Sequence, residues 1–139
     1  KDLLYFNIGN DMFSGKDYKD AADMYSSAIT SNGNLADAYL NRANARLALQ
    51  VLDGALADYT LYLQMRPQDP QRPNIEKVMA LIRGVQDAQA KAQAAAAARQ
   101  QALMNDVLQS LSNAGGDTQN VTVESIKGQN DPVDVDIKD

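Results

Sequence analysis

Two arginines at helical spacing are the residues best suited to bind an anion. Arg42 and Arg46 are four residues apart, so in a helix they lie on one face. Guanidinium groups hold carboxylates through paired hydrogen bonds, and the two side chains could therefore form a cradle for a partner's carboxylate. The alternative is structural. In that case the side-chain stems pack along a neighbouring helix and the charged ends pair with Asp58 or Asp23 of the same chain.

Residues that could support catalysis or bind a metal are scarce. The chain has no histidine and no cysteine, so it lacks the commonest general base and the thiolate metal ligand. An acidic cluster near the end lacks the central glycine and final glutamate of a helix-loop-helix calcium site, and we interpret it as a solvated tail. Its members are Asp131, Asp134, Asp136 and Asp139. We expect no enzymatic activity, no metal and no cofactor.

Length, composition and charge limit the remaining classes. A chain of 139 residues with 45% hydrophobic content suits one globular domain. Residues 113–139 carry six acids and two bases, which account for four of the five net negative charges. Nothing resembles a basic stripe, and no apolar run approaches the ~20 residues that span a bilayer. We therefore expect neither a nucleic-acid partner nor a transmembrane segment. The chain begins at Lys1 rather than methionine, as a shortened or processed chain does.

The elements that must position these side chains are indicated by an echo at a period of 34 residues. Tyrosines and small residues of the first copy recur in the second. Tyr5, Gly9, Ala21 and Tyr25 recur as Tyr39, Ala43, Ala55 and Tyr59. The apolar pattern predicts four helices at about 2–14, 17–31, 36–49 and 53–66. Small residues at the repeated positions let paired helices approach closely, while the tyrosines bury their rings and keep a hydroxyl for a partner.

This repeat resembles the tetratricopeptide repeat, a helix-turn-helix unit of that period. The resemblance implies an all-α fold with one unit at 1–34 and a second at 35–69. Members of this family hold another protein on a concave face lined by the first helix of each unit. The corresponding groove residues in this sequence are Phe6, Asn10, Phe13, Leu40, Asn41, Asn44 and Leu47. A mixed apolar and amide groove suits an extended segment or a helix held by its apolar face.

Chaperone-binding relatives grip a partner's terminal carboxylates with lysine, arginine and asparagine side chains. Asn10 and Asn41 match the two asparagine positions of that clamp. Phe6 stands where the first lysine is expected, and no third repeat supplies the remaining cations. The match is limited to two residues that are common at these places in any such repeat.

A fifth helix is predicted after the prolines at 67, 70 and 73, with Asn74 as its cap. Its apolar face can cover the open end of the last repeat. The stretch 70–82 also resembles repeat proteins of spirochaetes, which implies a bacterial cell-envelope type and favours the periplasm. Alanine-rich sequence extends this long capping helix over 74–112, and its stretch 75–112 is about 57 Å long at 1.5 Å per residue. The alternative is a helix that frays or folds back near Gly84.

The far end of this helix and the tail suggest an assembly surface. A stripe of large apolar residues at helical spacing needs a partner, either another chain or the tail. The stripe is Leu103, Met104, Val107, Leu108 and Leu111. In the acidic tail, 113–139, alternating apolar residues predict strands at 120–127 and 132–138 around a turn, with disorder as the alternative.

Two functions follow from the sequence. The first is a non-catalytic adaptor or scaffold that binds a segment of another protein in the repeat groove, with Arg42 and Arg46 as possible anion contacts. The second is an assembly module that forms a homo-oligomer, such as a coiled coil, through the long helix and the tail.

Overall fold

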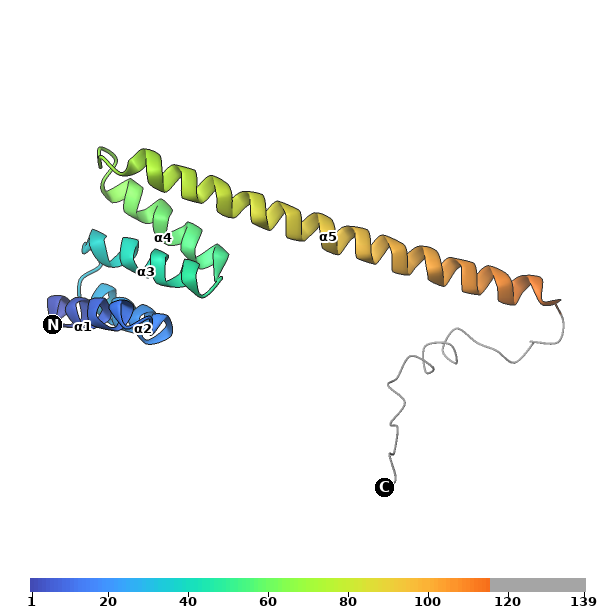
Figure 1. Cartoon of the computed structure of the whole chain (residues 1–139), viewed down its shortest axis with the longest axis horizontal. Helices are drawn as coiled ribbons and strands as arrows, with labels where there is room; N and C mark the ends of the chain where they lie inside the picture. The colour runs from blue at the N-terminus through green and yellow to red at the C-terminus, as the bar shows by residue number, and fades with distance from the viewer. Residues whose placement is uncertain (116–139) are drawn as a thin grey trace, which may run out of the picture. The chain divides into compact units, whose positions relative to one another are not determined.

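The computed structural model describes residues 1–115, which form five helices and no strand (Figure 1). The helices are α1 Asp2–Ser14, α2 Tyr18–Ser31, α3 Ala36–Ala48, α4 Leu52–Met65 and α5 Arg72–Asn113. The strands expected at 120–127 and 132–138, and the acidic cluster of the tail, lie outside the described residues. The all-α prediction of four short helices and one long helix is confirmed for the part of the chain that the structure describes.

The start of α5 differs from the prediction. The helix begins at Arg72, so Asn74 lies in its first turn and is not the cap. Asp69 organises this start, because its side chain accepts a hydrogen bond from the Gln71 backbone N–H at 2.7 Å and its carbonyl accepts one from Arg72 N–H at 3.0 Å. Pro73 is compatible with a first helical turn, where a missing N–H leaves no hydrogen bond unmade.

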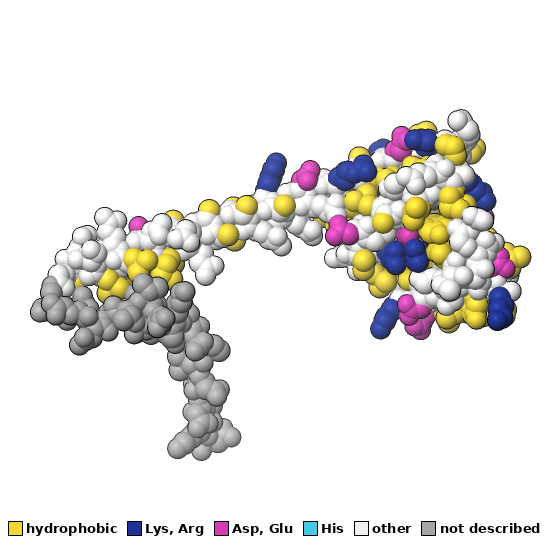
Figure 2. Space-filling model, turned by 180° about the vertical axis from the view of Figure 1, so that it is seen from behind, with side chains coloured by type: hydrophobic (Ala, Val, Ile, Leu, Met, Phe, Trp, Pro, Cys, Tyr) yellow, Lys and Arg dark blue, Asp and Glu magenta, His cyan; other side chains and the backbone are white. Residues whose placement is uncertain are grey.

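The long helix continues without a break through Gly84, so the alternative of a helix that frays or folds back there is wrong. The chain divides into two compact units, Lys1–Lys91 and Ala92 onwards, and α5 contributes to both. In Figure 2 charged side chains gather on the first unit, and few lie on the alanine- and glutamine-rich part of α5. Among the described residues, no helix combines the length and hydropathy needed to cross a membrane.

The first helix pair packs around a glycine. A Cβ atom built on Gly9 would lie 2.7 Å from Cε1 of Tyr25, well inside a carbon–carbon contact. Tyr25 is 1% exposed and packs with Ala21 and Ala45, and its ring centroid lies 5.9 Å from that of Phe6. The close approach predicted at this small residue is confirmed.

The turns within the two helix pairs have the same backbone but different chemistry. Lys16 and Gln50, one period apart, both have positive φ, 63° and 60°. Asp17 then caps α2 by accepting a hydrogen bond from the Asp20 backbone N–H. Val51 stands at the equivalent cap of α4 and makes no such bond. The second turn therefore lacks a stabilising contact that the first has.

Helix α5 occupies the position that the first helix of a third repeat would take. Ile75, Met79 and Ile82 are buried in a core shared with Tyr59 and Tyr62 of α4. This packing completes the core of the second pair, as a terminal cap must.

The face of α5 that would contact the second helix of a third pair is unsuited to helix packing. One period after Gly9 and Ala43, where the second helix of each pair comes close, stands Lys77, which is exposed. A charged side chain at that position opposes close packing of another helix. The described chain therefore ends its repeat array at α5.

Candidate functional site

A cleft between α1 and α3 gathers most of the predicted groove residues. Its volume is about 240 Å³. Its lining, here called the amide cleft, consists of Asn10, Phe13, Ser14, Tyr25, Asn41 and Asn44. The first helices of both pairs thus contribute to one surface, with a tyrosine of α2 behind it.

Tyr25 fixes the orientation of Asn10. The tyrosine hydroxyl donates to Oδ1 of Asn10 at 2.8 Å, and Nδ2 of Asn41 donates to the same oxygen at 2.9 Å. Burial raises the pKa of Tyr25 above its ordinary value, so the hydroxyl keeps its proton and remains a donor. With its oxygen doubly engaged, Asn10 presents its amide N–H groups to a ligand.

The same arrangement recurs one period later. The hydroxyl of Tyr59 donates to Oδ1 of Asn44 at 2.6 Å, and burial raises the pKa of Tyr59 to about 12. Asn44 is therefore oriented like Asn10, with its N–H groups available. Two amide donors with fixed orientation can bind carbonyl oxygens of a peptide.

Two further depressions, here together called the α3–α5 groove, are lined by residues of both α3 and α5. One end has a volume of about 210 Å³ and is lined by Leu40, Asn44, Tyr59, Gln71, Asn74, Ile75 and Val78. The other end has a volume of about 500 Å³ and is lined by Leu47, Gln50, Leu52, Asp53, Val85, Gln86 and Gln89. Asn44 lines both the amide cleft and the narrow end of this groove, so the two meet at Asn44.

The structure brings together six of the seven predicted groove residues. Asn10, Phe13, Asn41 and Asn44 line the amide cleft, while Leu40 and Leu47 line the α3–α5 groove. Phe6 is half-buried against Tyr25 and lines none of these clefts. Its position indicates a packing role for the ring.

Sequence reasoning missed the residues that α5 contributes. The period of 34 residues leads from Phe6 and Leu40 to Asn74, and from Asn10 and Asn44 to Val78. Both α5 residues line the groove. Extending the register by one more period identifies them. From the sequence pattern, this helix is expected to have a capping role and a self-association stripe, but no groove residues.

Charged side chains take no part in lining the amide cleft or its continuation at Leu40 and Val78. A clamp for terminal carboxylates requires lysine or arginine at these places. Asn10 and Asn41 do lie together, but the lining offers them no cationic neighbour. The site therefore suits a neutral stretch of polypeptide better than a chain terminus.

The two arginines hold a carboxylate of their own chain. Arg42 binds both oxygens of Asp58 at 2.8 Å and donates to Oγ of Ser26 at 3.0 Å, and Arg46 binds Asp58 at 2.9 Å. Asp58 is 1% exposed, so both charges serve a buried network between α2, α3 and α4. The structural alternative holds for Asp58, whereas Asp23 is not among the partners.

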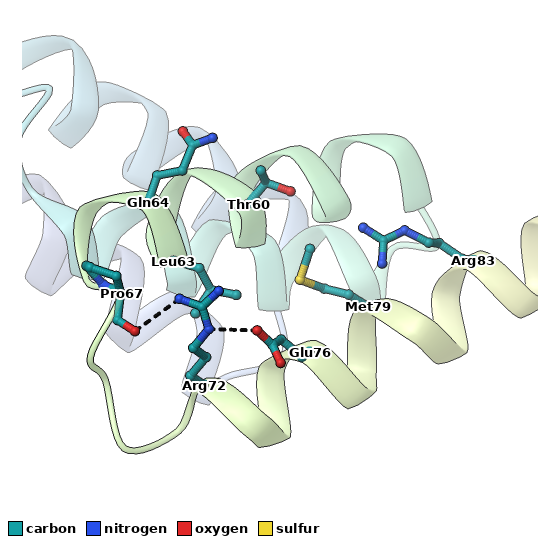
Figure 3. Close-up of a pocket in the computed structure, with 8 residues that line it drawn as sticks. All are labelled: Thr60, Leu63, Gln64, Pro67, Arg72, Glu76, Met79 and Arg83. Carbon is teal, nitrogen blue, oxygen red and sulfur yellow. Dashed lines mark hydrogen bonds and ion pairs between the residues drawn. The ribbon is translucent and has the colours of Figure 1, made fainter.

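A further cleft of about 610 Å³ lies between α4 and α5 and has a different lining (Figure 3). Arg72 lies across it, donating to Glu76 at 2.7 Å and to the Pro67 carbonyl at 3.0 Å. Arg83 also lines it and has no ion pair among the described residues. Arg72, Glu76 and Arg83 give this cleft a charged lining, which the amide cleft lacks.

The predicted apolar stripe lies on the part of α5 that belongs to the second unit. Leu103 and Val107 are 65% and 39% exposed, while Met104, Leu108 and Leu111 are half-buried. Self-association through these residues stays a prediction.

These helix pairs define the class of fold, an all-α array of two helix-turn-helix units ended by a long helix, which is the arrangement expected for tetratricopeptide repeats. No protein-family model and no curated protein sequence match the chain. Among solved structures, it is similar to the first TPR of Spaghetti (RPAP3) bound to the HSP90 peptide SRMEEVD, with 21% identity, a TM-score of 0.39, and coverage of 63% of this chain and 94% of that one. It is also similar to the first TPR domain of human RPAP3, with 20% identity, a TM-score of 0.41, and coverage of 65% and 95%. Neither likeness bears on the cell-envelope expectation.

Proposed function

We propose that this protein is an adaptor that binds a segment of another protein along the amide cleft and the α3–α5 groove. The observation that carries the proposal is the repeated tyrosine–asparagine pair. Tyr25 and Tyr59 each donate to the oxygen of an asparagine that lines the cleft, so the N–H groups of that asparagine remain as its donors for a ligand. Main-chain carbonyls of an extended segment are the ligands that such donors fit.

The lining also indicates what kind of segment binds. Amide and apolar groups line the amide cleft without a charged residue. Burying a charged ligand there would leave its charge unpaired, at a cost of several kcal/mol. We therefore expect an internal, uncharged stretch of the partner over Asn10 and Asn44.

The test begins with selection of peptides from a random phage-displayed library on the immobilised protein. Affinities of the selected peptides are then measured by fluorescence polarisation for the parent and for Asn44→Asp. This substitution keeps an oxygen that can accept from Tyr59 but removes the N–H donors. Loss of a hydrogen bond and introduction of a charge in the cleft should weaken binding about tenfold or more.

Asn105→Asp is the matched control, because Asn105 is exposed on α5 in the second unit and lines neither cleft. It adds the same charge without touching the groove. Equal affinities for the parent and Asn44→Asp, with unchanged helix content, would show that the amide cleft does not bind the segment.

The second candidate function is assembly through the far part of α5. The observation in its favour is the exposure of Leu103 and Val107, four residues apart on one helical face. Burying such side chains contributes about 1.5–3 kcal/mol each before ordering costs. Light scattering on the whole chain, beside a chain ending at Ala88, tests it. If both chains are monomeric at high micromolar concentration, assembly by this route is excluded.

A further inference from the structure

The wide end of the α3–α5 groove has the size and chemistry of a side-chain pocket. It is about 500 Å³ in volume and lies between the turn that joins α3 to α4 and the second half of the α5 segment in the first unit. Ligand pockets in proteins commonly measure about 300–1,000 Å³. We call its seven lining residues the anchor pocket. They are Leu47, Gln50, Leu52, Asp53, Val85, Gln86 and Gln89.

The pocket's charge favours a neutral, apolar occupant. Leu47, Leu52 and Val85 supply apolar surface, and three glutamines supply neutral polar groups. The single charged residue, Asp53, accepts a hydrogen bond from Nε2 of Gln86 at 2.6 Å. With no cation in the lining, an acidic side chain gains no partner there and is repelled by Asp53.

The neighbouring turn has large apolar residues where its counterpart has glycine and aspartate. Leu49 and Val51 stand one period after Gly15 and Asp17, and they are 40% and 48% exposed. Because Val51 replaces a capping aspartate, the turn forgoes about 1 kcal/mol of helix-end stabilisation. Folding alone does not explain this exchange, since the backbone of the two turns is the same. A surface that contacts an apolar group does explain it.

The anchor pocket and the amide cleft are both lined by residues of α3, about one helical turn apart. Leu47 lies three residues, about one helical turn, beyond Asn44 on α3. On the opposite wall, Val85 lies seven residues, about two turns, beyond Val78 of α5. Leu81, between them in sequence, is 64% exposed. A segment bound at Asn44 can therefore reach the pocket within a few residues.

We propose that the anchor pocket receives one large apolar side chain, aromatic or aliphatic, of the partner segment, and so sets the specificity of the groove. Since the pocket serves a segment bound as proposed above, its role rests on that proposed function. The neutral cleft binds main chain, which is common to all partners, while the pocket distinguishes one side chain from another.

The test uses a probe that mimics the anchor alone. N-acetyltryptophanamide is neutral and carries one large apolar side chain, and N-acetylglycinamide lacks the side chain. N-acetyltryptophanamide is titrated into the whole ¹⁵N-labelled protein. We expect saturable NMR chemical-shift changes at the backbone amides of residues 47–53 and 85–89, with a dissociation constant in the millimolar range. N-acetylglycinamide should give none there.

Two variants locate the binding. Val85→Asp places a charge in the pocket wall, and Gln89→Trp fills it, and both side chains are exposed enough to be replaced without unfolding. Each should weaken the probe about tenfold or more. Leu61→Asp is the matched control, because Leu61 on α4 is 41% exposed, against 49% for Val85, and does not line the pocket.

The outcomes separate this inference from the function on which it rests. Saturable shifts that are lost in both pocket variants and kept in Leu61→Asp support the anchor pocket. Absence of shifts, or shifts unchanged by both pocket variants, overturns it. In that case selected peptides that still depend on Asn44 show that the groove binds without an apolar anchor. If no peptide depends on Asn44 either, the proposed function fails as well.

Discussion

Adding one methyl group to Gly9 should weaken the fold by the cost of overpacking. The new Cβ would lie 2.7 Å from Cε1 and 2.9 Å from Cδ1 of Tyr25, whereas carbon atoms pack best at about 3.5–4.0 Å. The ring cannot easily retreat, because it is 1% exposed and its hydroxyl is bound to Asn10. Overpacking of this kind costs about 1–3 kcal/mol.

A second glycine supplies the matched control. Alanine is favoured over glycine in a helix by about 1 kcal/mol, which offsets part of the cost at Gly9. Gly84 also lies within a helix, and nothing lies within 4 Å of its added Cβ. Gly84→Ala should therefore show the helical gain alone. The difference between the two variants isolates the overpacking, about 1–3 kcal/mol.

The assay is thermal unfolding followed by circular dichroism, with urea unfolding as a second measure. For a domain the size of the first unit, Lys1–Lys91, 1 kcal/mol shifts Tm by about 4–8 °C. We expect Gly84→Ala to melt above the parent and Gly9→Ala below it. If both variants raise Tm by the same amount, Tyr25 does not pack against Gly9 as closely as described, and the reasoning is wrong.

Three further outcomes are expected. Asp58→Ala should destabilise the protein by about 3–5 kcal/mol in urea unfolding, because it leaves two part-buried guanidinium groups without their carboxylate. Asp87→Ala, at an exposed site, should change the free energy of unfolding by no more than about 0.5 kcal/mol. The free energy of unfolding should fall as pH rises from the ordinary tyrosine value of 10.0 to about 12, because the unfolded chain releases the Tyr59 proton first and so binds fewer protons in that window. An unfolding free energy that stays constant across the window would contradict the burial of that hydroxyl. A chain ending at Pro73 should lose its cooperative melt, because it lacks the core residues Ile75, Met79 and Ile82, and a melt near the parent's Tm would show that α5 is dispensable.

The helices of the repeats could be predicted because their boundaries are set locally. Small residues, tyrosines and turns recur at one spacing, and the four predicted helices agree with the structure to within one residue at each end. The start of α5 was misplaced because proline and asparagine in sequence suggest a boundary, while the start depends on Asp69. Its role emerges only when the backbone folds back on it.

The site was predicted in outline and missed in two respects. The groove positions on α1 and α3 follow from the repeat. Those on α5 were overlooked because Pro73 and Lys77 replace the tyrosine and the small residue that mark the pattern. The orientation of Asn10 and Asn44 could not be predicted, since it depends on hydroxyls of another helix that lie fifteen residues away in sequence.

Because of the buried network around Asp58, the two repeats cannot exchange places along the chain. Arg42 and Asp58 stand where the first repeat has Ile8 and Met24, so a charged pair has replaced an apolar pair at equivalent places. Arg42 also reaches back to Ser26 of the preceding repeat. Exchanging only Arg42 or only Asp58 with its counterpart in the first repeat would leave a charged side chain unpaired. Moving the second repeat to the front would leave Arg42 without Ser26. Modules of this array cannot be shuffled or duplicated one helix at a time, and viable rearrangements must carry α3 and α4 together, behind a helix whose serine hydroxyl accepts the hydrogen bond from Arg42.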